Sequence, residues 1–241
     1  MNTLRLSLRL LLIILALFVA LAGHGLTRLL RLPSPWPRRL LGTFALICGA
    51  RARIVGAPLR RDVVFVANHL SWLDILLIAG ATGSAFVAKA ELKRVPLVGW
   101  LCTLNNTLFV ERGDRMGVAG QVATVRAALA EGWAVTLFPE GTTGDGSALM
   151  PFKAALFAAL DPPPPGVRVQ PIALDYGGAT RELAWVGDEP GQAHAARVLR
   201  RTGTFAATLR FLEPFAPADH PGRKAIAAEA QRRVAAGREA A

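Results

Sequence analysis

The chain has 241 residues, a formal net charge of +11 at pH 7 and a mean hydropathy of +0.36. This length suits one α/β domain with its own core and a short additional segment. A chain that is both basic and apolar predicts an anionic membrane surface as partner and argues against nucleic acid. Its two cysteines and four histidines form no CxxC or Cys/His cluster, so the sequence predicts neither a disulfide framework nor a metal site.

The N-terminal segment is apolar. Residues 10–27 carry no charge, and arginines lie on both sides of them. Three interpretations fit: a cleaved signal peptide, a single membrane-spanning helix, or a helix that dips into one leaflet. Basic flanks disfavour translocation of either end. Prolines at 33, 35 and 37 predict a turn, and residues 40–50 are apolar but too short to span. We therefore favour a membrane-anchoring helical hairpin, residues 1–50, on the cytoplasmic face of the inner membrane.

From residue 51 onwards, short apolar runs alternate with helical segments. The runs typical of strands are 53–55, 63–66, 85–88, 107–110, 134–138, 167–175 and 206–212. The segments typical of helices are 71–78, 91–102, 118–130, 152–160 and 224–236. This alternation predicts an α/β domain, residues 51–241, with a mixed, largely parallel sheet flanked by helices. Ligands in such sheets bind in loops that follow the strands.

Four polar side chains stand between the second expected strand and the first helix of this domain: Asn68, His69, Ser71 and Asp74. Burying them unpaired would be costly. If the helix begins at Ser71, then Ser71 and Asp74 fit a capping box, and the first turn can fold Asp74 back toward the imidazole of His69. A histidine held by a carboxylate is the arrangement of a general base. The alternative is that Asp74 only caps the helix and His69 is an ordinary loop residue.

Three later strand ends also carry unusual residues. Glu111 and Arg112 follow one strand, residues 138–142 read Phe-Pro-Glu-Gly-Thr, and Pro171 interrupts an apolar run. Each has a simple explanation when taken alone: a surface ion pair, a turn in which glycine supplies a positive φ, and an edge strand. Lys153, a little further on, could be only an exposed helix residue. Together with the first strand end, however, they form an ordered series.

Taken in this order over residues 62–175, these segments resemble the glycerolipid acyltransferase family, whose best-known members are the lysophosphatidate (1-acylglycerol-3-phosphate) acyltransferases. The family's Asn-His motif with Asp five residues after the His matches residues 68–74. Its aromatic–aliphatic–acid–Arg motif, its Phe-Pro-Glu-Gly-Thr motif and its apolar strand with proline match residues 109–112, 138–142 and 169–173. Four ordered matches are far more specific than one.

The resemblance implies that His69 is the catalytic base and that Asp74 fixes its tautomer. It implies an acceptor site that contains Arg112, Glu111, Glu140, Gly141, Thr142 and Lys153. The expected reaction moves a fatty acyl group from acyl-CoA or acyl carrier protein to the free hydroxyl of a lysolipid, in phospholipid biosynthesis. It is expected to need neither a metal nor another cofactor. The expected partners are the acyl donor, the lysolipid and the anionic bilayer surface, without nucleic acid.

One position departs from the family pattern. The family's lysophosphatidate enzymes commonly have Arg directly after Phe-Pro-Glu-Gly-Thr, where this chain has Thr143. Arg is the side chain best suited to bind a phosphate through two hydrogen bonds, so its absence leaves the acceptor open. The loop resembles branches that acylate other lysolipids, including lyso-ornithine lipid.

Two other function classes compete. A hydrolase would need a nucleophile elbow, and the sequence has no Gly-x-Ser-x-Gly. A non-catalytic membrane-surface binding protein would explain the apolar segment and the positive charge. It would not explain His69, Asp74 and Glu140 at strand ends.

Overall fold

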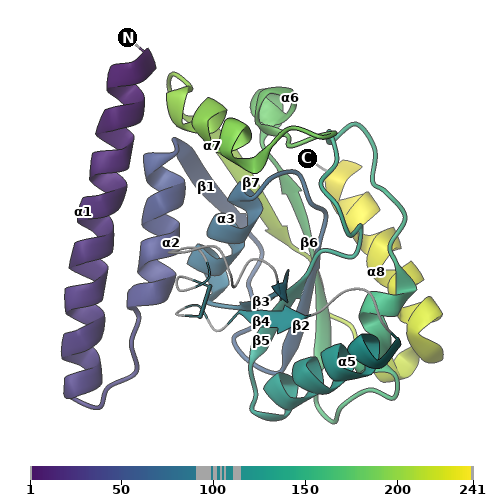
Figure 1. Cartoon of the computed structure of the whole chain (residues 1–241). Coiled ribbons are helices and arrows are strands. Elements are labelled where there is room, and N and C mark those ends of the chain that lie inside the picture. Colours follow the sequence, from purple (N-terminus) through teal and green to yellow (C-terminus); the bar gives the residue numbers. More distant parts are fainter. Residues whose placement is uncertain are drawn as a thin grey trace.

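The computed structural model describes residues 2–90, 99, 102–103, 105, 107–110 and 115–239. Two helices come first, α1 (Asn2–Leu29) and α2 (Trp36–Ile47), and they form the expected hairpin along one flank of the molecule (Figure 1). By length and composition, the part of α1 from Thr3 to Leu29 could cross a membrane, and most of it is exposed. One apolar N-terminal helix of this kind is consistent with membrane association.

The hairpin packs on the rest of the protein through α2, which contacts α3 (Leu73–Thr82). The two helices approach closely where Gly42 faces Gly80. A Cβ atom on Gly80 would lie 2.8 Å from the Cα atom of Gly42, which is too close for any larger side chain. This small-residue contact therefore holds α2 directly against the first helix of the α/β domain.

Within the described residues, seven strands form one sheet in the order β1-β7-β6-β2-β5-β3-β4. Adjacent strands are parallel except β6 and β7, so the predicted mixed, largely parallel sheet is confirmed. The strands are β1 (Ala50–Val55), β2 (Val63–Ala67), β3 (Ala85–Lys89), β4 (Leu108–Val110), β5 (Ala134–Leu137), β6 (Arg168–Asp175) and β7 (Phe205–Phe211).

The central strand β2 is buried along its whole length, and its side chains alternate between two cores. Val63, Phe65 and Ala67 belong to the core beneath α2, α3 and α7 (Gly191–Arg200). Val64 and Val66 belong to the opposite core, covered by α5 (Arg115–Ala130), the 3₁₀ helix η2 (Ala154–Leu160) and α8 (Gly222–Glu239) (Figure 1). Burial on both faces explains the continuous apolar run.

The sheet has a topological switch point at β2. The chain leaves β2 toward β3 on one side, whereas β6 pairs with β2 on the other side. The carboxyl ends of β2, β5 and β6 therefore open at one edge, where crevices form in open α/β sheets.

Several elements differ from those predicted. The sequence predicted no helix between residues 176 and 205, where the structure has η3 (Gly177–Ala179), α6 (Thr180–Leu183) and α7. It also has η4 (Pro217–Asp219). The segment of α7 is short and polar overall, and it buries only His194, Val198 and Leu199, so its sequence lacks the apolar run that marks the other helices. The predicted helix at 152–160 is the 3₁₀ helix η2, and most of the predicted helix at 91–102 lies outside the described residues.

Candidate active site

The loop between β2 and α3 brings His69 and Asp74 together. Nδ1 of His69 lies 2.7 Å from Oδ2 of Asp74. The Asp74 side chain is fully buried, whereas 16% of the His69 side chain is exposed. An imidazole that donates its Nδ1 hydrogen to a carboxylate has an unprotonated Nε2, which is the nitrogen available to accept a proton. The pairing predicted from the sequence is present, with the geometry of a general base and its orienting acid.

The Asp74 carboxylate also holds the turn that leads into α3. Its Oδ2 accepts backbone hydrogen bonds from Leu70 at 2.6 Å and Ser71 at 3.0 Å, and the second of these is one half of the predicted capping box. The other half is not formed, because the Ser71 hydroxyl accepts from the Leu73 amide at 3.4 Å while the Asp74 amide donates to the Ser71 carbonyl. The helix begins at Leu73, two residues later than predicted, and Asp74 therefore serves the turn before it as well as the His69 ring.

A further bond to Asp74 comes from Tyr176, directly after β6. Its hydroxyl donates to Oδ1 of Asp74, on the side away from the histidine. Burial and the charge of Asp74 raise the pKa of Tyr176 well above its ordinary value, so the phenol stays protonated and remains a donor. With four donors, the buried carboxylate has the partners that such a charge requires. Tyr176 is the chain's only tyrosine, and the sequence analysis gave it no role at this site.

The plane of the imidazole is fixed by an aromatic neighbour. Phe138 stacks on His69 with ring centroids 3.9 Å apart and an angle of 14° between the planes. Phe138 stacks in turn on Phe86 at 5.9 Å. The aromatic residue that opens the Phe-Pro-Glu-Gly-Thr segment thus holds the His69 ring from one face, a contact that the sequence pattern alone did not reveal.

The loop after β5 clamps the backbone of His69 from both sides. Oε1 of Glu140 accepts from the His69 amide at 2.7 Å, and the Gly144 amide donates to the His69 carbonyl at 2.8 Å. Oε2 of Glu140 accepts from the Met150 amide at 3.0 Å. Burial raises the pKa of Glu140, and the hydrogen bonds from the two amides oppose this effect. These bonds give Glu140 a positioning part in the site, whereas its contact with the acceptor stays a prediction.

Of the other predicted acceptor residues, Gly141, Thr142 and Lys153 lie at or beside the same loop. Gly141 has φ +75°, and a Cβ atom there would lie 2.6 Å from Nζ of Lys153, so the lysine side chain passes directly over the turn. Thr142 follows and is exposed. Glu111 and Arg112 lie outside the described residues. The strand before them, β4, ends at Val110 and runs parallel to β3, so its carboxyl end opens at the same edge of the sheet.

Asn68, directly before the histidine, ties the loop to β6. Its side-chain Nδ2 donates to the Leu174 carbonyl at 2.9 Å, and its Oδ1 accepts from the Leu174 amide at 2.8 Å. The amide side chain thereby continues the ladder between β2 and β6 beyond the last strand residue. The position of the loop is thus set from β6 as well as from β5.

A second buried group, around His194 of α7, supports the start of α3. Nε1 of Trp72 donates to Nδ1 of His194 at 2.8 Å, and Nε2 of His194 bonds to the Leu183 carbonyl at 3.1 Å. Trp185 stacks on His194, and its amide donates to the Leu70 carbonyl at 2.8 Å. Burial lowers the pKa of His194, which favours the neutral ring that can accept from Trp72. This helix was not predicted, so its contribution to the site was missed.

Among the described residues, no group of three or more His, Cys, Asp and Glu side chains could hold a metal ion. In the same part of the chain, every buried side-chain nitrogen and oxygen atom has a hydrogen-bond partner. The polar groups around His69 therefore already satisfy one another, and they form a preorganised site.

Comparisons with known proteins identify the family of this chain. A family model described as Acyltransferase matches residues 52–175. A lyso-ornithine lipid O-acyltransferase of Rhodobacter capsulatus is 33% identical over 241 residues, which cover 92% of this chain and 86% of that protein. A 1-acyl-sn-glycerol-3-phosphate acyltransferase of Neisseria gonorrhoeae is 39% identical over 115 residues, which cover 47% of this chain and 44% of that protein.

The fold is also shared with a solved structure. The crystal structure of the 1-acyl-sn-glycerophosphate acyltransferase from Thermotoga maritima superposes with a TM-score of 0.70 at 22% identity, over 100% of this chain and 97% of that one. At this identity the likeness concerns the fold. The family model and the full-length sequence match carry the further conclusion: the chain belongs to the lysolipid acyltransferase family and is an acyltransferase.

Proposed function

We propose that this protein transfers a fatty acyl group to the free hydroxyl of a lyso-ornithine lipid, with His69 as the general base. Two observations favour this acceptor over lysophosphatidate. The relative named for lyso-ornithine lipid matches along 92% of this chain, and the relative named for glycerol phosphate along 47%. Thr143 stands where the resemblance expects Arg, and its hydroxyl is engaged with the Trp185 carbonyl.

The proposed mechanism follows from the distance between His69 and Asp74. Nε2 of His69 removes the proton of the acceptor hydroxyl, and the hydroxyl oxygen attacks the carbonyl carbon of the thioester. Asp74 stabilises the imidazolium that forms. The carbon–sulfur bond then breaks, and the thiolate takes the proton from the imidazolium. The donor is acyl-CoA or acyl carrier protein, and the step uses no metal or other cofactor. General-base help of this kind contributes about 10²–10⁴-fold.

The proposed location is the cytoplasmic face of the inner membrane. Residues 1–50 form the anchor and residues 51–241 the catalytic domain. Arg5 and Arg9, near the start of α1, bond to backbone carbonyls of α7 in that domain. A helix held to the catalytic domain near its N-terminus, and through α2 further on, supports a hairpin in one leaflet rather than a separate spanning helix.

Release of free thiol tests the proposed reaction. The full-length protein in mixed micelles would be given acyl-CoA or acyl carrier protein thioester with lyso-ornithine lipid, with lysophosphatidate, or without an acceptor. We expect fast thiol release only with lyso-ornithine lipid. Equal release without an acceptor would indicate a hydrolase, and faster release with lysophosphatidate would overturn the assignment of the acceptor.

Arg112→Ala should raise the KM for the lysolipid about tenfold or more, because a charged hydrogen bond to the carboxylate of the ornithine head group contributes about 1.5–3 kcal/mol. The KM for the acyl donor should change much less. Steady-state kinetics with each substrate varied in turn measure both values. Arg126→Ala is the matched control, because it removes an arginine of α5 whose side chain bonds to the Pro162 carbonyl and which has no proposed contact with either substrate. An equal rise for both substrates would make Arg112 a structural residue.

Tyr176→Phe should move the acid limb of the pH–rate profile upward by up to about 1 pH unit. Without the phenol, the Asp74 carboxylate keeps more of its negative charge and stabilises the imidazolium more strongly. The pH dependence of kcat/KM for the lysolipid measures this shift, and thermal unfolding measures the cost of the lost hydroxyl. A lower rate with an unmoved acid limb would leave Tyr176 with a purely structural role.

A further inference from the structure

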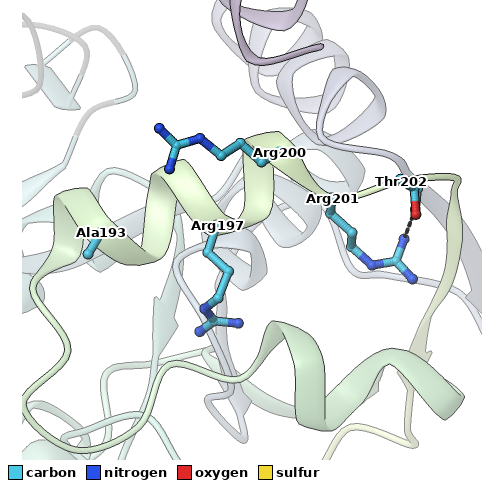
Figure 2. A pocket seen from close by; sticks show the side chains of 5 residues that line it. All are labelled: Ala193, Arg197, Arg200, Arg201 and Thr202. Atoms are coloured by element: carbon cyan, nitrogen blue, oxygen red, sulfur yellow. Dashed lines mark hydrogen bonds between the residues drawn. The ribbon is translucent and has the colours of Figure 1, made fainter. Parts of the chain in front are cut away.

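A groove of about 430 Å³ lies along α7, apart from the His69 site. Its walls come from one stripe of the helix and the residues that follow it (Figure 2): Ala193, Arg197, Arg200, Arg201 and Thr202. Three arginines within five positions are more than this short surface helix needs for solubility. The acyl-transfer mechanism uses none of them.

Two of these arginines are held by carboxylates. Arg197 makes a two-point contact with Glu189, at 3.0 and 2.7 Å, and Nε of Arg201 lies 2.7 Å from Glu182. Arg200 is exposed, and none of the ion pairs among the described residues includes it. Figure 2 shows its side chain extending away from the other two. Within the described part of the chain, Arg200 therefore carries the charge of the groove that has no counterion.

The first turns of α1 bring further positive charge to the same place. Arg5 donates to the Arg200 carbonyl at 3.2 Å, and Arg9 donates to the carbonyls of Val198 and Leu199 at 3.0 and 3.2 Å. These bonds satisfy the last carbonyls of α7, which explains why Arg5 and Arg9 are present. They do not explain Arg200. Five guanidinium groups therefore lie close to the two carboxylates of Glu182 and Glu189.

The groove also borders apolar surface. The start of α1 that supplies Arg5 and Arg9 exposes leucines, with Leu4 76% and Leu8 52% accessible. Exposed leucines beside arginines are typical of a segment at the boundary between acyl chains and head groups. The ligand chemistry that fits an uncompensated guanidinium is a phosphate, which accepts its hydrogen bonds in pairs. At this boundary the phosphate is that of a bilayer lipid.

The groove is connected to the active site through one layer of aromatic rings. The guanidinium of Arg201 lies over the ring of Phe205, 5.3 Å from its centroid. Phe205 contacts Tyr176 edge-to-face, with centroids 5.5 Å apart, and Tyr176 bonds to Asp74. A lipid head group held at the groove would therefore fix the bilayer surface close to the edge of the sheet where His69 lies.

We propose that the groove formed by Arg197, Arg200 and Arg201 of α7, next to Arg5 of α1, binds the phosphate of an anionic membrane lipid. The site orients the domain on the bilayer. Arg200 is the residue of the site whose guanidinium is available to contact the phosphate. The inference rests on the proposed membrane location of the hairpin, but it does not require acyl transfer. Lipid binding and turnover are therefore measured separately.

The test is the partition of the full-length protein onto vesicles of phosphatidylcholine alone and of two-thirds phosphatidylcholine with one-third phosphatidylglycerol. Arg200→Gln should weaken binding to the anionic vesicles about fivefold, which corresponds to the ~1 kcal/mol that one arginine contributes near an anionic surface. Binding to phosphatidylcholine alone should be unchanged. Turnover with micellar substrate should stay at the wild-type level, because Arg200 touches no part of the His69 site.

Arg223→Gln is the matched control, since it removes an equal charge from an exposed position on α8. Equal losses for Arg200→Gln and Arg223→Gln would show that only net charge matters, and would overturn the proposal. Weaker binding of Arg200→Gln to both kinds of vesicle would also overturn the proposal. Binding of CoA or acyl carrier protein that Arg200→Gln weakens, with vesicle binding intact, would assign the groove to the acyl donor instead.

Discussion

His69→Ala should lower acceptor-dependent thiol release by about 10²–10⁴-fold while the protein still binds to membranes. The substitution removes the ring that Asp74 holds through Nδ1, and with it the Nε2 atom that is proposed to take the proton of the acceptor hydroxyl. The hairpin and the loop bonds made by the His69 backbone do not depend on the imidazole. The measurement is turnover with saturating lysolipid and thioester, together with vesicle flotation.

His220→Ala is the control for this substitution. His220 is a partly buried histidine whose ring contacts Phe215, on the far side of the sheet from the site. Its loss should leave turnover near the wild-type rate. Turnover of His69→Ala within a fewfold of wild type would contradict the mechanism.

Asp74→Asn should lower the rate by about 10²–10⁴-fold with little change in the fold. Two backbone amides and the His69 ring donate to Oδ2, so the amide oxygen of Asn takes that position and its NH₂ group turns to Tyr176. The phenol can accept there, because a hydroxyl both donates and accepts. What disappears is the negative charge that stabilises the imidazolium.

Circular dichroism and thermal unfolding would check that Asp74→Asn is folded. Asp175→Asn, at the last residue of β6, is the matched control. The Asp175 side chain accepts a hydrogen bond from Thr180, which an asparagine oxygen can also do. A folded Asp74→Asn protein with nearly full activity would show that Asp74 acts only as a helix cap.

The sequence was sufficient for the parts of the site that are local. His69 and Asp74 are five residues apart, and a helix start near Ser71 allowed the carboxylate to fold back to the ring, with a cap alone as the alternative; the contact is present, although α3 begins at Leu73. The sheet was equally accessible, because β2 is buried on both faces and its apolar run is continuous. Within the described residues, the parallel strands β2 and β5 end at the same edge of the sheet, and a polar motif follows each of them.

The parts that the sequence did not reveal depend on long-range contacts. Tyr176 reaches Asp74 from 102 residues away, and Glu140 reaches the His69 amide from 71 residues away. Neither contact has a periodic or spacing signal. Helix α7 buries few apolar side chains. The stacking of its His194 on Trp185, which precedes the helix, is recognisable only once the chain is folded.

These distant contacts share one purpose. Glu140 and Gly144 fix the backbone of His69, Phe138 fixes the plane of its ring, and Tyr176 fixes the acid that orients it. In the proposed mechanism, preorganisation of this kind would lower the barrier because no rearrangement is needed when charge develops on the imidazole. The same bonds explain how His69 can hold a defined geometry although it lies in a loop.

The most direct test of the account is the pH dependence of kcat/KM for acceptor-dependent thiol release, measured in wild type and in His69→Ala. We predict that the wild-type rate falls at low pH with a slope of one proton, and that the residual rate of His69→Ala lacks this limb. An acid limb with the same midpoint in His69→Ala would show that another group is the base.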